Sequence, residues 1–497
     1  MVYYGKISLG CQRCRQRKVK CDQRRPGCVK CENLATKCPG YRNLTEILFR
    51  DESERIIRKA HRKHHRPNIP ASHPRALLLS GNHTPSIFAP LSLSISDLGA
   101  SFFFTKYLPR ETVVSRNFHD WLSGVYSSKD SNYALHAIIQ AVGIAGLFNV
   151  SPSQVKTVES QKLYSQAVSA LQRLFNDPVH ATSDATLTAV ILLALYEIVT
   201  FQTREDQGSL PLTSMSLTHI EGAIAILESR GQEQFTYERG GHLLGQVSTR
   251  MVCLNNPMTM DNILNRANPI QLPMCLHHGI AVPPALVQAT YNFHTSPLWS
   301  HRSSHPGSLT EIAFRLVNLH AAIQSGYMTQ PLIRSEALEI DHDLELWREG
   351  VPPGWRYTIN YNKGDRNINT CLDGKFHVYA SHRIAETWNS WRSQRIAINQ
   401  IIVRNELSSG PETAYVAAIS AIRRFSEDIC LSIGYLVDSP RSFSLVQPLY
   451  VISIEELNSS GLRLLAISEL RRMSTSMGIR QAGLLAENSS KRIGLLG

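Results

Sequence analysis

The sequence predicts a mainly α-helical protein with a small cysteine-rich module at its N-terminus, a flexible linker and a large all-helical body. Three observations predict this organisation. Six of the ten cysteines lie between Cys11 and Cys38, and five prolines among many serines lie in residues 67–100. From about residue 101, apolar residues recur with the i, i+3, i+4 rhythm of buried helix faces. We therefore expect domains at 10–41 and 101–497, joined by a basic helix and a linker at 42–100.

The excess positive charge of the chain lies at its N-terminal end. Residues 1–66 hold 18 Lys/Arg and 6 Asp/Glu, a difference that equals the net charge of +12 of the whole chain. A basic end on a neutral body favours a module that binds a polyanion. Charge alone does not distinguish such a module from a solvated basic tail.

The clustered cysteines follow a two-fold repeat, in which a C-x-x-C pair is followed by six residues and one more cysteine. A structural zinc ion takes four ligands in a tetrahedron. Two zinc ions therefore need eight thiolate contacts, which six cysteines supply only if two sulfurs bridge both metals. By the repeat, the bridging residues are the first of each half, Cys11 and Cys28. The first zinc would bind Cys11, Cys14, Cys21 and Cys28, and the second would bind Cys11, Cys28, Cys31 and Cys38.

A three-disulfide knot is the alternative for these cysteines. It requires an oxidising compartment, whereas the opening residues MVYYGKISLG contain no apolar core of a secretory signal. It also leaves nine Lys/Arg between Cys11 and Cys38 without a role. About 30 residues with few apolar side chains cannot form a core, so zinc would supply the folding free energy, on the order of 10 kcal/mol per ion.

The cysteine frame, Lys18 in C-R-Q-R-K-V-K-C and Pro26 before Cys28 resemble the fungal six-cysteine binuclear zinc cluster transcription factors. The resemblance implies two short helices, each starting at a C-x-x-C pair, joined by a loop that contains the proline. It also implies that the first helix enters the major groove of double-stranded DNA and reads a CGG-type triplet.

The same resemblance assigns roles to the residues around the first helix. Its C-terminal end, Arg17, Lys18 and Lys20, would face the bases. Lys18 matches the family's base-contacting lysine and is expected to donate to guanine O6 and N7, and the backbone carbonyl of Arg17 would face the bases beside it. Contacts to phosphates are expected from Gln12, Arg13, Arg15, Lys20, Arg24, Arg25 and Lys30.

No dimerising coiled coil follows the cluster. An apolar stripe begins at Leu44 but is broken by Asp51 and Arg55, so three or four sustained heptads are absent. The basic stretch through Arg66 favours further phosphate contact or nuclear import. The sequence therefore predicts a nuclear protein, and a homodimer, if one forms, would use the body.

The sequence of the body predicts one helix after another. Apolar stripes run through 164–175, 217–227, 375–407, 413–437 and 462–486, with long loops near 202–214, 254–308 and 351–372. Asp184 is a candidate N-cap for the apolar helix at 185–201. That run contains Glu197 and is shorter than the roughly 20 residues of a membrane span, so we expect a core helix and no membrane partner.

The body also resembles the fungal-specific regulatory domain that accompanies these clusters. The resemblance rests on D-A-T-L-T-A-V-I-L-L-A-L-Y-E from Asp184, on L-T-H-I-E-G-A, and on S-R-G ending at Gly231. His219 and Glu221 lie in this region, but their spacing separates them on a helix, so we expect His219 to have a packing role.

The sequence contains no G-x-S-x-G, Walker, dinucleotide-glycine or H-E-x-x-H motif, so we expect no enzymatic activity. The leading hypothesis is a zinc-dependent transcription factor acting at RNA polymerase II promoters. The alternative is an effector-binding or enzymatic helical domain with an appended zinc module, since a large helical body can hold a small-molecule cavity. A zinc-stabilised module that binds only proteins is a third hypothesis, against which the basic first helix argues.

Overall fold

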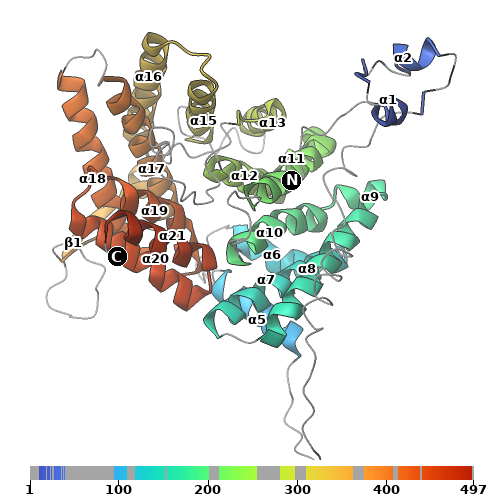
Figure 1. Ribbon diagram of the computed structural model, residues 1–497. Coiled ribbons are helices and arrows are strands. Elements are labelled where there is room, and N and C mark those ends of the chain that lie inside the picture. The colour runs from blue at the N-terminus through green and yellow to red at the C-terminus, as the bar shows by residue number, and fades with distance from the viewer. Residues whose placement is uncertain are drawn as a thin grey trace, which may run out of the picture.

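The computed structural model describes most of the body and much of the cysteine-rich module. The described residues are 11–17, 19–22, 24, 27–34, 36, 38–39, 94–108, 118–151, 154–200, 212–254, 280–296, 309–361, 374–406, 412–436 and 439–494. The fold is mainly α, as predicted, and Figure 1 shows the helices of the body gathered into one mass. The basic stretch and the Pro/Ser-rich part of the linker lie outside the described residues.

The first part of the body is a group of helices around α7. Its elements are α5 (Ile95–Lys106), α6 (Phe118–Ser127), α7 (Tyr133–Val150), α8 (Gln154–Leu174), α9 (Pro178–Ala181), α10 (Asp184–Thr200), α11 (Leu212–Arg230), the 3-10 turn η1 (Gly231–Thr236) and α12 (Glu238–Leu254). Helix α7 packs against α5, α8 and α10. Because α7 is apolar on most of its circumference, burial from several sides is the arrangement that its sequence favours.

Helix α7 is the one helix among the described residues that is long and apolar enough to cross a membrane by length and composition. Of its 18 residues, 61% are buried inside the protein. Its neighbours α5, α8 and α10 cover it. Core packing therefore accounts for the apolar composition of α7. The sequence had suggested residues 185–201, and not α7, as the apolar helix to be weighed against a membrane span.

The contact between α5 and α7 depends on two glycines. A Cβ atom placed on Gly143 of α7 would lie 1.8 Å from the carbonyl oxygen of Gly99 on α5. The two backbones thus approach more closely than any other residue would allow.

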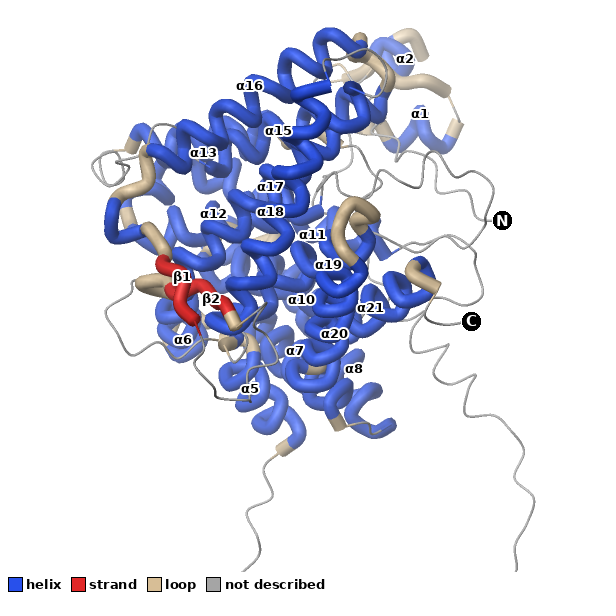
Figure 2. The backbone as a smooth tube through the Cα atoms, turned by 90° about the vertical axis from the view of Figure 1, so that its left-hand side faces the viewer, coloured by secondary structure: helices blue, strands red, loops and turns tan. Residues whose placement is uncertain are grey.

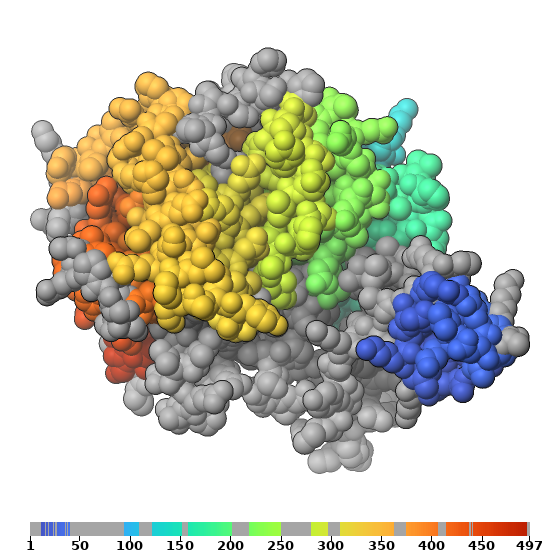
Figure 3. All heavy atoms as spheres, turned by 90° about the horizontal axis from the view of Figure 1, so that it is seen from above, coloured from blue at the N-terminus to red at the C-terminus, as the bar shows by residue number. Residues whose placement is uncertain are grey.

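The second part of the body begins with a row of helices. Its elements are α13 (Pro284–Thr295), α15 (Leu309–Ser325), α16 (Gln330–Glu349), the turn η3 (Pro353–Trp355), the strands β1 (Thr358–Tyr361) and β2 (Lys375–Val378), α17 (His382–Glu406) and α18 (Glu412–Leu436). Helices α13, α15, α16 and α17 pack in chain order, and Figure 3 shows α13, α15 and α16 in yellow across the upper face.

The two strands correct the prediction of an all-helical body. They pair antiparallel, with Thr358 opposite Val378 and Tyr361 opposite Lys375, and Figure 2 shows them at the edge of the helices. Every residue of β1 is exposed. The segments T-I-N-Y and K-F-H-V do alternate polar and apolar residues, but each over only four positions, the shortest run that indicates a strand, so the period-two signal was weak.

The last elements return to the first helices. They are the turn η4 (Pro440–Leu445), α19 (Val446–Ile454), α20 (Ser460–Met477) and α21 (Arg480–Arg492). The Tyr107 hydroxyl donates to the Met477 carbonyl at 2.8 Å, and Asn149 Nδ2 donates to the Gly478 carbonyl at 2.7 Å. Residues from α5 to α21 therefore share one hydrophobic core.

Two predicted boundaries differ from the structure. The N-cap of α10 is Ser183, whose Oγ accepts the Thr186 N–H at 3.2 Å, so the prediction of Asp184 as the cap was wrong by one residue. The Asp184 carboxylate forms ion pairs with Arg230 and Arg239 instead. Helix α5 starts at Ile95, within the range predicted as linker. Its apolar residues fall too close to the Pro/Ser-rich stretch for composition to separate the two.

A pair of alanine substitutions tests the close crossing of α5 and α7. In Gly143→Ala, the new methyl meets backbone, so we expect the free energy of unfolding to fall by about 1–3 kcal/mol or more. Gly245→Ala in α12 is the matched control, because nothing lies within 4 Å of its added Cβ. Because alanine favours the helix more than glycine does, this control should raise the free energy of unfolding by up to about 1 kcal/mol. Urea denaturation of the full chain measures both, and equal effects would contradict the crossing.

Candidate metal centre and nucleic-acid interface

The six clustered cysteines lie together in the two groups that the repeat predicts. One group is Cys11, Cys14, Cys21 and Cys28, and the other is Cys11, Cys28, Cys31 and Cys38. Within each group the sulfur atoms lie within 4.8 Å of one another. Cys11 and Cys28 belong to both groups, as expected of bridging ligands.

The distances between the sulfurs fit tetrahedral zinc. With zinc–sulfur bonds of about 2.3 Å, the edge of a tetrahedron of sulfurs is about 3.8 Å long. Cys11 Sγ lies 3.7 Å from Cys28 Sγ and from Cys31 Sγ, and Cys14 Sγ lies 3.7 Å from Cys28 Sγ. A disulfide would bring two sulfurs to about 2.05 Å. All six cysteines are free, so the geometry does not support the disulfide knot.

Each C-x-x-C pair opens a short helix, as the resemblance implies. Helix α1 (Gln12–Gln16) starts after Cys11, and α2 (Val29–Glu32) starts after Cys28. The Cys14 N–H donates to Cys11 Sγ at 3.4 Å, because one helical turn brings position i+3 back to position i. Backbone N–H groups thus stabilise the charge of the sulfur ligands from within the module.

Burial affects the protonation of the thiols. It raises the pKa of Cys31 to about 12, and it also raises the pKa values of Cys14 and Cys28 above their ordinary value. Only the thiolate is a zinc ligand. Zinc must therefore displace protons from these sulfurs when it binds.

The residues expected to contact DNA lie mostly on the surface of the module. Exposed side chains belong to Gln12, Arg17, Lys20, Arg24 and Lys30, and Arg13 is half-buried. Arg15 lies on α1. Lys18 and Arg25 lie outside the described residues. The exposed basic side chains are therefore available to a polyanion.

The sequence analysis missed the two acidic residues of the module. Asp22 Oδ2 accepts the N–H of Val29, the first residue of α2, at 3.3 Å. Glu32 at the end of α2 forms an ion pair with Arg24. Their rarity was the available signal, since Asp22 and Glu32 are the only acids among residues 1–41.

In the body, His219 has a buried partner. Its Nε2 lies 3.0 Å from Glu197 Oε1 on α10 and 3.4 Å from the Tyr164 hydroxyl on α8. His219 and Glu197 are both buried, whereas Glu221 is exposed. His219 thus joins three helices, in agreement with a packing role.

A second distinctive position of the body closes α11. Arg230 donates from Nε to the Thr182 carbonyl at 2.7 Å and pairs with Asp184. Gly231 follows with a φ of +60°, a left-handed conformation that ends the helix. These contacts hold α11 against the start of α10.

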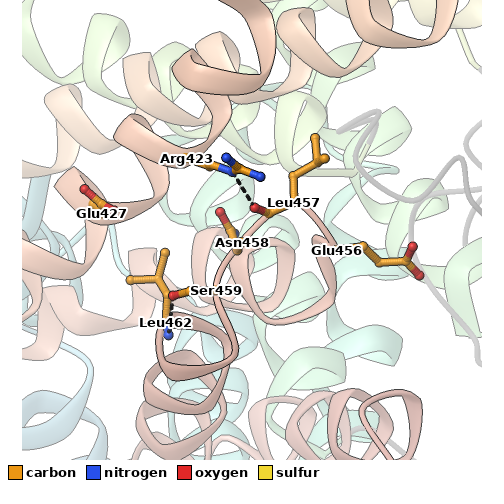
Figure 4. Close-up of a pocket in the computed structure, with 7 residues that line it drawn as sticks. All are labelled: Arg423, Glu427, Glu456, Leu457, Asn458, Ser459 and Leu462. Atoms are coloured by element: carbon orange, nitrogen blue, oxygen red, sulfur yellow. Dashed lines mark hydrogen bonds between the residues drawn. The ribbon is translucent and has the colours of Figure 1, made fainter. Parts of the chain in front are cut away.

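A hollow of about 370 Å³ lies between α18 and the turn from α19 to α20. Figure 4 shows its lining residues, Arg423, Glu427, Glu456, Leu457, Asn458, Ser459 and Leu462. Arg423 Nε already donates to the Leu457 carbonyl at 2.8 Å. Small-molecule sites are lined mostly by apolar residues, whereas five of these seven residues are polar or charged, so the hollow does not support an effector site.

Two family models match the chain. Residues 9–46 match the fungal Zn(2)-Cys(6) binuclear cluster domain, and residues 99–267 match the fungal specific transcription factor domain. Both resemblances drawn from the sequence are thereby confirmed, and the module holds two zinc ions. Together the matches place a zinc cluster domain and a fungal specific transcription factor domain in one chain.

Two curated relatives match over the module. White-opaque regulator 2 of Candida albicans is 45% identical over 38 residues, which are 8% of this chain and 8% of the relative. The aspercryptin biosynthesis cluster-specific transcription regulator atnN of Emericella nidulans is 49% identical over 41 residues, which are 8% of this chain and 7% of the relative. The aligned stretch thus spans under a tenth of each relative's length. No solved structure matches.

Shared and unshared ligands should differ in their effect on zinc content. Cys11→Ser removes a ligand from both groups, whereas Cys38→Ser removes one from a single group. We expect the full chain to hold two zinc ions, and Cys11→Ser to lose more zinc than Cys38→Ser, as measured by native mass spectrometry. Cys430→Ser, in the core of the body, is the control and should keep both ions. Equal losses in the two module variants would contradict bridging.

Zinc affinity should also depend on pH. Burial keeps the pKa values of Cys14, Cys28 and Cys31 above their ordinary value, so these thiols are protonated between pH 6 and pH 8. Zinc displaces their protons on binding, and affinity should therefore increase as the pH rises. Competition with a chelator between pH 6 and pH 8, corrected for the chelator's own protonation, measures the slope. A flat profile would exclude thiolate ligation.

Proposed function

We propose that this chain, which joins a fungal binuclear zinc cluster domain to a fungal specific transcription factor domain, is a zinc-dependent, sequence-specific transcription factor for RNA polymerase II promoters. One observation carries the proposal: two four-sulfur groups share Cys11 and Cys28, and the exposed basic residues Arg17 and Lys20 follow α1. The zinc ions supply structure, since four protein sulfurs leave no open position for a reacting group.

The module would bind DNA through α1. Zinc fixes α1 at its first turn, so the metal centre holds the basic residues at the C-terminal end of the helix in a fixed position. Lys18 would read guanines of a CGG-type triplet in the major groove, with the Arg17 carbonyl and Lys20 beside it. Phosphate contacts from Gln12, Arg13, Arg15, Lys20, Arg24, Arg25 and Lys30 would fix the register without reading sequence.

The division of labour along the chain is part of the proposal. Residues 10–41 would bind DNA, 42–100 would provide a basic extension and a linker, and 101–497 would form the regulatory domain. Both curated relatives are named as regulators, and transfer of that role assigns the protein to the nucleus. Since the relatives match only the module, the regulatory role of the body rests on the family model for residues 99–267.

Substitution of a base-reading residue and of a phosphate-binding residue should affect DNA affinity differently: only the first effect should depend on the DNA sequence. Lys18→Ala should abolish the preference for a CGG-containing duplex over a scrambled one, a loss worth about 1–3 kcal/mol. Arg24→Ala should weaken binding to both duplexes alike. Fluorescence anisotropy with the full chain measures both variants. An equal loss on the two duplexes for Lys18→Ala would refute the assignment of Lys18 to bases.

The alternative of an effector-binding or enzymatic body makes a different prediction. If the zinc module only accompanies such a body, Cys28→Ser should leave the cellular role intact. In the proposed function, the same variant should lose its DNA sites in genome-wide mapping and also lose regulation of the genes beside them.

A further inference from the structure

Both acidic residues of the zinc module contact other residues of the module. Residues 1–41 hold ten Lys/Arg and only two Asp/Glu. Asp22 accepts a backbone N–H at the start of α2, which is a structural contact. Glu32 instead binds the side chain of Arg24, one of the residues proposed to contact phosphate.

The Arg24–Glu32 pair lies at the surface. The two side chains retain 54% and 52% of their exposure, so solvent and other anions reach both partners. A guanidinium binds carboxylates and phosphodiesters through the same planar arrangement of N–H donors. Glu32 therefore occupies Arg24 with the same chemistry that a DNA phosphate would use.

The pair joins two segments of the module. Arg24 lies between Cys21 and Cys28, and Glu32 is the last residue of α2, directly after the zinc ligand Cys31. Because Cys31 is a ligand of the metal centre, Glu32 has a fixed position. Breaking its pair with Arg24 costs little, since exposed pairs are weak.

We propose that Glu32 is an internal competitor for DNA phosphate at Arg24, and that it lowers the affinity of the module without changing its base preference. The inference rests on the proposed function and adds a residue that sets binding strength. Binding to DNA breaks the carboxylate–guanidinium pair and forms a phosphate–guanidinium pair, and Glu32 returns to solvent. Removing the charge of Glu32 should then strengthen binding only while Arg24 is present.

The test is a double-mutant cycle in the full chain, with Glu32→Gln, Arg24→Ala and the double variant, each checked for its two zinc ions. Anisotropy at one salt concentration measures the Kd for CGG-containing and scrambled duplexes. Glu32→Gln should tighten binding to both by about two- to fivefold, the range that exposed ion pairs allow. In the Arg24→Ala background, the same change should have no effect on either duplex.

Other outcomes overturn the inference in distinct ways. Equal tightening in both backgrounds would mean that Glu32 acts only by its charge at a distance. Weaker binding by Glu32→Gln would mean that the pair positions the loop, and an unchanged Kd would mean that no competition takes place. If the unmodified chain binds neither duplex, the proposed function fails first, and the inference fails with it.

Discussion

Sharing of two thiolates between two zinc ions is the constraint on which the N-terminal module depends. Among the described residues of this module, the buried hydrophobic side chains are the cysteines themselves, so metal–sulfur bonds replace the core that a segment of this length cannot form. The 3.7 Å separation of Cys11 and Cys28 serves as the common edge of both tetrahedra. Loss of the two shared sulfurs would separate α1 from α2, and the basic residues would no longer be held in a fixed position.

The metal centre also explains how charge is arranged around it. Six thiolates and two divalent ions leave a net negative centre, and the surrounding Lys and Arg offset it while facing outward. Only two acids enter this shell, and each has a defined partner, Val29 for Asp22 and Arg24 for Glu32. The module thus keeps α1 free of acidic residues, and each acid links a residue between Cys21 and Cys28 to α2.

The parts of the molecule with a strict periodicity could be predicted from the sequence. The cysteine repeat predicted both metal groups and their shared residues, and the apolar stripes predicted the helices around 164–175 and 217–227. The β1–β2 hairpin was not predicted, because each strand alternates polar and apolar residues over only four positions. The Arg24–Glu32 pair was not predicted either, since the two residues are eight positions apart and share no helix face or strand register that a sequence pattern would indicate.

X-ray absorption at the zinc edge of the full chain tests the shared thiolates most directly. Two tetrahedra with a common sulfur edge predict four sulfurs at about 2.3 Å around each zinc and a zinc neighbour at roughly 3 Å. A spectrum with both features would support the account. Nitrogen or oxygen ligands, or four sulfurs without a metal neighbour, would contradict it.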